Sequence, residues 1–135
     1  MHTAYLALGT NLGEKDRNLQ IAIVKIAESV GALSAASSIY TSEPWGYVSE
    51  NAFLNQVIRV ETQLSPVELL HAVQDIEKQM GRIRKRSTGY QDRVIDIDII
   101  LYDDLVYQST ELTIPHPLYQ QRPFVVEPLK EILSV

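Results

Sequence analysis

The run from Val94 to Tyr102 constrains this chain most, because it places two acidic residues inside an otherwise apolar strand. The run reads VIDIDIILY, and apart from the two aspartates its residues are mostly β-branched and apolar. Polar loops bound it on both sides, which is typical of a buried β-strand. Side chains alternate across a strand, so Asp96 and Asp98 share one face, with Cα atoms roughly 6.6 Å apart. The other face is predicted to carry Ile95, Ile97, Ile99 and Leu101.

Two like charges this close are costly to bury unless a cation lies between them. A pair of Mg²⁺ ions about 3.5–4 Å apart, bound to a phosphate chain, would offset that cost. The alternative is an edge strand with a solvated acidic face, although Asp is depleted in strands. The pattern therefore indicates either a dinuclear magnesium site or a solvated edge.

Length and composition limit the classes of function. A chain of 135 residues favours one domain, residues 1–135, with one core. It contains no cysteine, which excludes disulfides, thiol nucleophiles and Cys-ligated metals. A net charge of −5 argues against a general nucleic-acid binder. With no secretory pattern and no apolar run that could span a bilayer, we expect a cytoplasmic monomer without a membrane partner.

The order of the predicted elements indicates the architecture. Ser65, Pro66 and Glu68 form a capping-box start for one helix, and Gly31 and Gly81 stand where helices end. The order β-α-β-β-α-β is that of an α+β, ferredoxin-like sandwich, an antiparallel sheet with two helices on one face, followed here by a C-terminal extension. The predicted ranges are strands at 4–8, 33–40, 53–62 and 94–102, helices at 16–30 and 66–80, and helical character near 128–133.

If both helices cover one face, the acidic face of the last strand is open. By the same alternation Phe53 and Asn55 point to that open side, while Leu54, Ile58 and Val60 point to the helices. A ring, an amide and two carboxylates would then share one surface. Phe53 and Asn55 taken alone are equally ordinary strand residues.

A basic loop, residues 80–93, leads into the acidic strand. Such a cluster in an acidic protein suits a small polyanion such as a nucleoside triphosphate, or it is a solvated charged loop. Gln74 and Glu77 make a polar edge on the second helix, which is either part of a site or a solvated flank.

A stiff segment, Pro115-His116-Pro117, holds a histidine outside any helix. His116 is either a turn residue or a donor to a phosphate oxygen. Arg122 and Phe124 follow, so a cation and a ring again stand together.

Five blocks, taken in order, resemble the bacterial 6-hydroxymethyl-7,8-dihydropterin pyrophosphokinases of folate biosynthesis. Each block is short, but their order and spacing are specific and span almost the whole chain. The blocks are YLALGTNLG from Tyr5, SIYTSEPWG from Ser38, FLNQV from Phe53, GRIR from Gly81 with RVIDIDI from Arg93, and PHP from Pro115 with RPFVVEPL from Arg122.

The resemblance implies transfer of the terminal pyrophosphate of ATP to the pterin hydroxymethyl group, with release of AMP. It implies two Mg²⁺ ions on Asp96 and Asp98. It also implies Phe53 and Phe124 stacked on the pterin, and Asn55 reading its edge. The other implied site residues are Ser42, Pro44 and Trp45 beside the pterin, Arg82, Arg84 and Arg93 on the phosphates, and Gln74, Glu77, Tyr90, Ile99, Thr113, His116 and Arg122 on the ATP side.

The loop before the acidic strand departs from the family pattern. It reads Tyr90-Gln91-Asp92-Arg93 where relatives commonly have Trp-Gly-Pro-Arg. Tyr90 can still cover the site, whereas Asp92 adds a negative charge beside the phosphates. We expect this loop to close over both substrates.

Two other functions are open on the residues alone. A metal-dependent phosphodiesterase or nucleotidyl transferase would use the same two aspartates without a ring pocket. A non-catalytic small-molecule-binding module would need no paired carboxylates beside a basic loop. No dedicated general base is recognisable.

Overall fold

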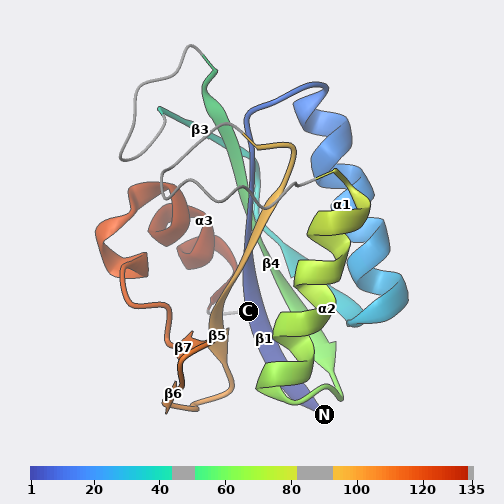
Figure 1. Cartoon of the computed structure of the whole chain (residues 1–135). Coiled ribbons are helices and arrows are strands. Elements are labelled where there is room, and N and C mark those ends of the chain that lie inside the picture. Colours follow the sequence, from blue (N-terminus) through green and yellow to red (C-terminus); the bar gives the residue numbers. More distant parts are fainter. Residues whose placement is uncertain (44–50, 82–92, 134–135) are drawn as a thin grey trace.

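The computed structural model describes residues 1–43, 51–81 and 93–133. One strand, a helix, three successive strands, a second helix and a further strand precede a short hairpin and a last helix (Figure 1). The elements are β1 (His2–Thr10), α1 (Lys15–Ser29), β2 (Gly31–Ala36), β3 (Tyr40–Ser42), β4 (Phe53–Thr62), α2 (Pro66–Gln79), β5 (Asp96–Tyr102), β6 (Tyr107–Gln108), β7 (Thr113–Ile114), a 3-10 turn at Tyr119–Gln121 and α3 (Pro123–Leu133).

The main sheet is antiparallel, in the order β2-β4-β1-β5, and β3 also pairs with β4. This arrangement confirms the predicted ferredoxin-like α+β class. The single strand predicted over 33–40 is wrong, because it divides into β2 and β3. Ser37 separates them: its N–H donates to Val57 O at 2.9 Å and its hydroxyl accepts from Val57 N at 3.0 Å.

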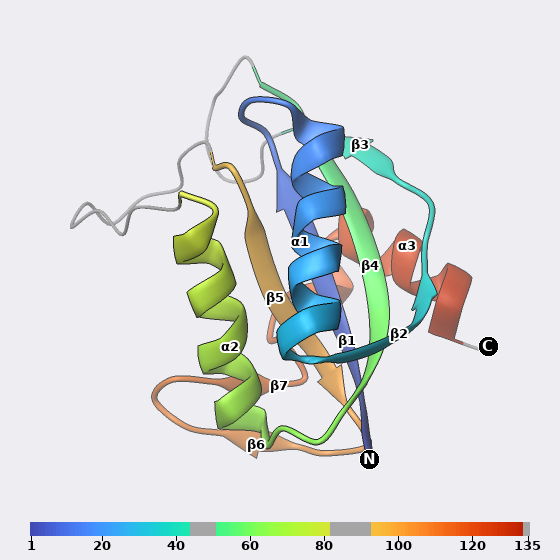
Figure 2. The same cartoon turned by 90° about the vertical axis from the view of Figure 1, so that its right-hand side faces the viewer.

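Helices α1 and α2 lie side by side on one face of the sheet, as Figure 2 shows. The capping box at the start of α2 is confirmed, since Ser65 and Glu68 exchange bonds of 2.8 and 3.3 Å. Apolar side chains from both helices and the inner sheet face form the main core. Its fully buried members include Leu6, Leu19, Ile26, Ile58, Leu69, Ile76 and Ile95. Among the described residues no helix is long and apolar enough to cross a bilayer.

Helix α3 covers part of the opposite face, which was predicted to be open. It starts at Pro123, five residues before the predicted helical stretch, because proline suits a first helical position. Val125, Leu129 and Ile132 lie on one stripe of α3 and pack in a second cluster with Tyr5 and Val57. Among the described residues, the part of this face that lines a pocket is the end of the sheet with Gly9, Asn55 and Asp96, next to the start of α3.

The predicted alternation of β5 breaks at Ile100. Leu6 pairs with Ile99 and Tyr5 pairs with Leu101, so Ile100 is an extra residue, a β-bulge. Ile100 and Leu101 both pack on the face of the sheet covered by α3, whereas Tyr102 packs on the face covered by α1 and α2. The prediction that Leu101 faces α1 and α2 is therefore wrong, whereas the alternation around Asp96 and Asp98 holds.

The two glycines predicted to end helices differ in role. Gly81 has φ +99°, as expected of a residue that terminates α2. Gly31 directly follows Val30, the C-cap of α1, and is also the first residue of β2, where an added Cβ would lie 2.0 Å from the carbonyl oxygen of Glu61. Gly31 is required by the close approach of β2 and β4.

We predict that Gly31→Ala lowers the free energy of unfolding by about 1–3 kcal/mol or more, because the clash is with backbone that cannot rotate away. Urea denaturation followed by circular dichroism measures this. Ala32→Ser, at an exposed position of the same strand, serves as control and should change stability by less than about 0.5 kcal/mol. Equal midpoints for wild type and Gly31→Ala would contradict the prediction.

Candidate active site

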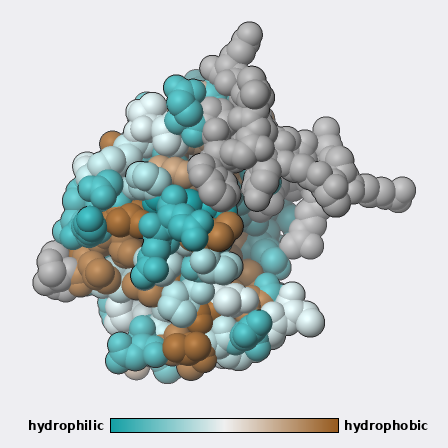
Figure 3. All heavy atoms as spheres, turned by 90° about the vertical axis from the view of Figure 1, so that its left-hand side faces the viewer, coloured by the Kyte–Doolittle hydropathy of each residue, from teal (hydrophilic) through white to brown (hydrophobic). Residues whose placement is uncertain are grey.

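A pocket of about 290 Å³ lies on the open end of the sheet, beside the first turn of α3. Figure 3 views the molecule from the α3 side, where polar and apolar residues lie interleaved. The pocket brings together predicted site residues from five elements and three connecting segments. These are Ser42, Phe53, Asn55, Gln74, Glu77, Arg93, Asp96, Asp98, His116, Arg122 and Phe124.

The floor of the pocket is set by β1, which pairs with β4 on one side and β5 on the other. Gly9 stands between Asn55 and Asp96. Neighbouring strands lie about 4.8 Å apart, so the amide and the first carboxylate start about 10 Å apart on the sheet. An added Cβ on Gly9 would lie 3.5 Å from the Phe53 ring and 3.6 Å from Asn55 Oδ1. The missing side chain thus leaves room above the floor.

One half of the pocket carries two aromatic rings and an oriented amide. Phe53 comes from β4 and Phe124 from the first turn of α3. Asn55 is only 5% exposed, and its Nδ2 donates to Tyr40 O at 3.1 Å and to Ser42 Oγ at 2.8 Å. Both amide protons are therefore committed to β3, and Oδ1 is the atom left to accept from a ligand.

The other half is acidic, with a partly buried cation beside it. Arg93 Nη1 lies 3.2 Å from Asp96 Oδ1, with side chains 21% and 27% exposed respectively. Asp98 follows on the same face of β5 and also lines the pocket. The positive charge of the Arg93 guanidinium offsets part of the electrostatic repulsion between Asp96 and Asp98.

Asn11 holds Arg93 in place and was not singled out from the sequence. Its Oδ1 accepts from the Arg93 N–H at 2.7 Å, and its own N–H donates to Arg93 O at 3.0 Å. Its Nδ2 donates to Asn51 O at 3.1 Å. This buried side chain joins the segment at Asn51 to Arg93, which lines the pocket. The available signal was an asparagine directly after the first strand, where an amide can replace backbone partners.

Glu77 approaches the acidic strand from α2. It is 5% exposed, and its Oε2 accepts from Ile97 N at 2.8 Å, between the two aspartates. The bond ties the outer edge of β5 to α2 and so holds the acidic pair in place. Gln74, almost one turn earlier on α2, lines the same side of the pocket.

His116 is held by backbone on both sides. Its N–H donates to Ile100 O at 3.1 Å, and its Nδ1 accepts from Leu118 N at 3.3 Å. An accepting Nδ1 assigns the ring proton to Nε2. Burial lowers the pKa of His116, the charge of Arg122 lowers it further, and Asp96 partly opposes them. His116 is thus a neutral donor at pH 7.

Some predicted site residues do not reach the pocket. Ile99 faces the main core and is 4% exposed, because it lies on the opposite face of β5 from Asp98. Thr113 pairs with Gln108 in the β6–β7 hairpin and does not line the pocket. Outside the described residues lie Pro44, Trp45, Arg82, Arg84 and Tyr90, together with the predicted loop closure.

The donor set fits magnesium that arrives with a phosphate chain. Within residues 1–43, 51–81 and 93–133 no cluster of three or more His, Asp or Glu could form a metal cage. Mg²⁺ is usually held by one or two carboxylates together with substrate phosphates and water, which is what Asp96 and Asp98 offer. The residues therefore suit a metal shared with a substrate.

Known proteins resemble this chain along nearly its full length. Residues 5–134 match the family model of 7,8-dihydro-6-hydroxymethylpterin-pyrophosphokinase. A 2-amino-4-hydroxy-6-hydroxymethyldihydropteridine pyrophosphokinase of Porphyromonas gingivalis is 43% identical over 98% of this chain and 91% of its own length. One of Haemophilus influenzae is 42% identical, covering 99% and 83%. A folic acid synthesis protein of Schizosaccharomyces pombe is 44% identical over 93% of this chain and 17% of its own.

Solved structures share the fold. A crystal structure of an HPPK-DHPS in complex with substrates superposes with a TM-score of 0.74 at 14% identity, covering 98% of this chain. The wild-type Plasmodium falciparum HPPK-DHPS with pteroate gives a TM-score of 0.74 at 16% identity over 96%. This chain spans 40% and 38% of those two longer chains. The family match and the full-length relatives together establish that the chain belongs to the 7,8-dihydro-6-hydroxymethylpterin-pyrophosphokinase family.

Proposed function

We propose that this chain, as one catalytic domain over residues 1–135, transfers pyrophosphate from ATP to the hydroxymethyl group of 6-hydroxymethyl-7,8-dihydropterin and releases AMP, in folate biosynthesis. One observation carries the proposal: a ring slot and an acidic half share one pocket floor, with Asn55 and Asp96 paired to opposite sides of Gly9. That separation suits a flat heterocycle at one end and a phosphate chain at the other.

In the ring half, Phe53 and Phe124 would stack on the two faces of the pterin, since aromatic pairs favour offset stacking with flat rings. Asn55 Oδ1 would accept from an N–H on the pterin edge, because its two amide protons are committed to β3. Ser42 lines the same wall, and Pro44 and Trp45 are proposed to complete it.

In the acidic half, the hydroxymethyl oxygen would bond to the β-phosphorus and lose its proton to water or an aspartate. The bond from that phosphorus to the α–β bridging oxygen would break, and AMP would leave with this oxygen. Asp96 and Asp98 would hold two Mg²⁺ ions, which supply charge neutralisation and orientation of the phosphates. Arg93, beside Asp96, would contact the phosphate chain, with Arg82 and Arg84 as further proposed partners. Positioning and electrostatics of this kind dominate phosphoryl transfer.

On the ATP side, the neutral Nε2–H of His116 would donate to a phosphate oxygen, and Arg122 would add a charge beside it. Gln74 and Glu77 would line the nucleotide, and Tyr90 is proposed as a further contact with it. Ile99 could contact ATP only through its backbone, because its side chain is in the core. A contact between ATP and Thr113 of the β6–β7 hairpin is also proposed.

Rival functions predict different products. A phosphodiesterase or nucleotidyl transferase would have no use for the ring slot of Phe53, Asn55 and Phe124, and a binding module would not need the acidic pair. We also propose a cytoplasmic monomer that binds neither nucleic acid nor membrane. Light scattering after size-exclusion chromatography tests the monomer directly.

We predict AMP and the pterin pyrophosphate as products, and a loss of turnover of about 10³-fold or more in Asp98→Ala with the fold intact. Mass spectrometry of a mixture of protein, ATP, Mg²⁺ and 6-hydroxymethyl-7,8-dihydropterin measures both. Asp104→Ala, the same change at an exposed residue just after β5, should keep activity. ADP as product, or an active Asp98→Ala, would refute the assignment.

We predict that Gly9→Val raises the dissociation constant for the pterin about tenfold or more, because a branched side chain would meet the Phe53 ring and Asn55. Calorimetric titration with the pterin, in the presence of a non-hydrolysable ATP analogue and Mg²⁺, gives the value. Ala32→Val, on the exposed edge strand β2, is the matched control. Unchanged pterin affinity in Gly9→Val would place the ring elsewhere.

We predict that the His116 ring titrates below 6.5 and carries its proton on Nε2, since burial disfavours its charged form. NMR spectra of the histidine side chains from pH 4 to 8 would measure both the pKa and the tautomer. The His116→Gln variant would assign the His116 signals. The contribution of the neutral His116 ring to folding stability is fully present above pH 6.5, the pKa of the unfolded chain. It is lost as the pH falls from 6.5 through the lower pKa of the folded protein. A titration above 6.5 would contradict this.

A further inference from the structure

A carboxylate on α3 binds the link between β2 and β3. Glu131 Oε1 accepts from Ser38 N at 3.0 Å, and its Oε2 accepts from Ser38 Oγ at 2.7 Å and from the Tyr40 hydroxyl. Three donors thus converge on one side chain. These bonds, led by the Ser38 backbone N–H, lower the pKa of Glu131, and the bond to Glu131 raises the pKa of Tyr40. Nothing in the sequence pattern singled out Glu131.

Both ends of this contact lead into the ring half of the pocket. On α3, Phe124 precedes Glu131 by seven residues, which is close to two helical turns, so both lie on one stripe of the helix. On the strand side, Tyr40 O and Ser42 Oγ orient the Asn55 amide, and Ser42 pairs with Phe53. The Glu131 carboxylate therefore joins the helix that carries one ring to the strand that pairs with the other.

We propose that Glu131 is a positioning residue that sets the separation of Phe53 and Phe124 and hence the affinity for the heterocyclic substrate. This inference rests on the proposed function, since it assumes that the two rings bind the pterin. The affinity of a site for a flat ring depends on the distance between the two aromatic side chains that enclose it. The dispersion attraction falls steeply when that distance exceeds its optimum by up to about 1 Å.

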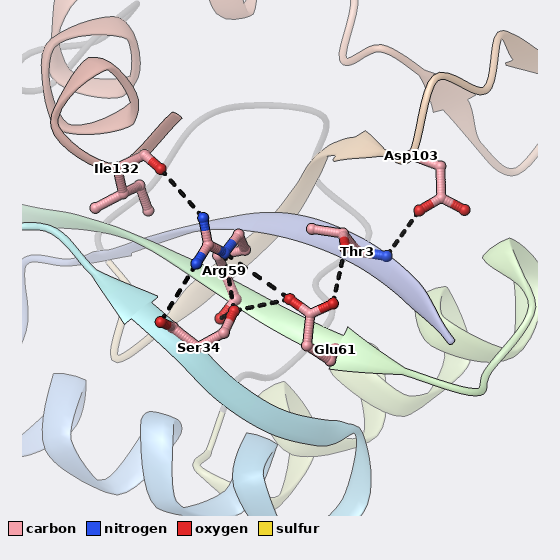
Figure 4. A network of polar contacts seen from close by, with 6 residues as sticks. All are labelled: Thr3, Ser34, Arg59, Glu61, Asp103 and Ile132. Carbon is pink, nitrogen blue, oxygen red and sulfur yellow. Dashed lines mark hydrogen bonds and ion pairs between the residues drawn. The ribbon is translucent and has the colours of Figure 1, made fainter. Parts of the chain in front are cut away.

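The helix does not need Glu131 to stay on the sheet. Val125, Leu129 and Ile132 pack against Tyr5 and Val57. Arg59 of β4 donates to Ile132 O at 3.5 Å and is itself held by Ser34 and Glu61, as Figure 4 shows.

The link between β2 and β3 also has its own anchor, the two bonds between Ser37 and Val57. Glu131 is an exposed side chain, and exposed charges contribute little to global stability. Loss of the carboxylate should therefore shift the helix relative to β3 without unfolding the chain.

The test compares Glu131→Ala, Glu131→Gln and Tyr40→Phe with wild type. Glu127→Gln is the matched control, since Glu127 is an exposed glutamate on the same helix whose Oε2 lies 3.5 Å from Lys130 Nζ. Each protein is titrated calorimetrically with 6-hydroxymethyl-7,8-dihydropterin in the presence of a non-hydrolysable ATP analogue and Mg²⁺. KM for each substrate, kcat and the unfolding midpoint are measured alongside.

We expect Glu131→Ala to raise the pterin dissociation constant about three- to tenfold, with ATP KM changed less than about twofold and the unfolding midpoint nearly unchanged. Glu131→Gln and Tyr40→Phe should show smaller effects in the same direction. Glu131→Ala combined with Tyr40→Phe should be non-additive, because the two residues share one contact.

Two results would overturn the inference: unchanged pterin affinity in Glu131→Ala, or a parallel loss for both substrates with a lowered midpoint, which marks a purely structural role. Failure of the proposed function looks different, because wild type itself would then bind no pterin. The two failures are therefore distinguishable.

Discussion

The double pairing of β1, with β4 along one edge and β5 along the other, is the constraint on which the site depends. It places Asn55 and Asp96 in one cross-strand row and Val57 and Asp98 in the next, with Gly9 and Ala7 between them. Two small residues on a central strand are poor at filling a core, but here they keep a floor open between larger neighbours. The sheet thus fixes the distance between Asn55 and Asp96 before any side chain moves.

Around that floor, two helices on opposite faces hold the working groups by different means. Helix α2 reaches β5 through a buried carboxylate, Glu77 on Ile97 N, so that the acidic strand cannot slide along the helix. Helix α3 brings Phe124 from the other face through apolar packing, supported by Arg59 and Glu131. The acidic half therefore depends on a buried hydrogen bond, and the ring half depends on close packing together with the hydrogen bonds of Glu131.

Sequence periodicity was enough to predict the sheet, both inner helices and the shared face of Asp96, Asp98, Phe53 and Asn55, because alternation along a strand is a local rule. It failed at Ile100 and at residues 37–39, where an extra residue and a serine that bonds across to β4 change the register. Those breaks depend on partners distant in sequence.

The contacts of Asn11 and Glu131 were beyond sequence reasoning for the same reason. Each joins segments at least 80 residues apart, as the separations of 82 and 93 residues show. No local pattern marks them. A short helical stretch at the C-terminal end was visible in the sequence, but its packing on the open face was not.

The amide of Asn55 has a consequence for selectivity among isosteric rings. With both protons engaged by Tyr40 O and Ser42 Oγ, the amide cannot rotate by a half-turn without losing two bonds. A flat ring with a nitrogen lone pair facing Asn55 Oδ1 would place two hydrogen-bond acceptors next to each other. A tautomer of that ring with an N–H at the same position would instead donate a hydrogen bond to Oδ1. A site built on buried polar groups rejects the wrong partner far more strongly than one built on shape. If the proposed pterin site is correct, this strand pair would select its ligand by protonation pattern and not by ring size.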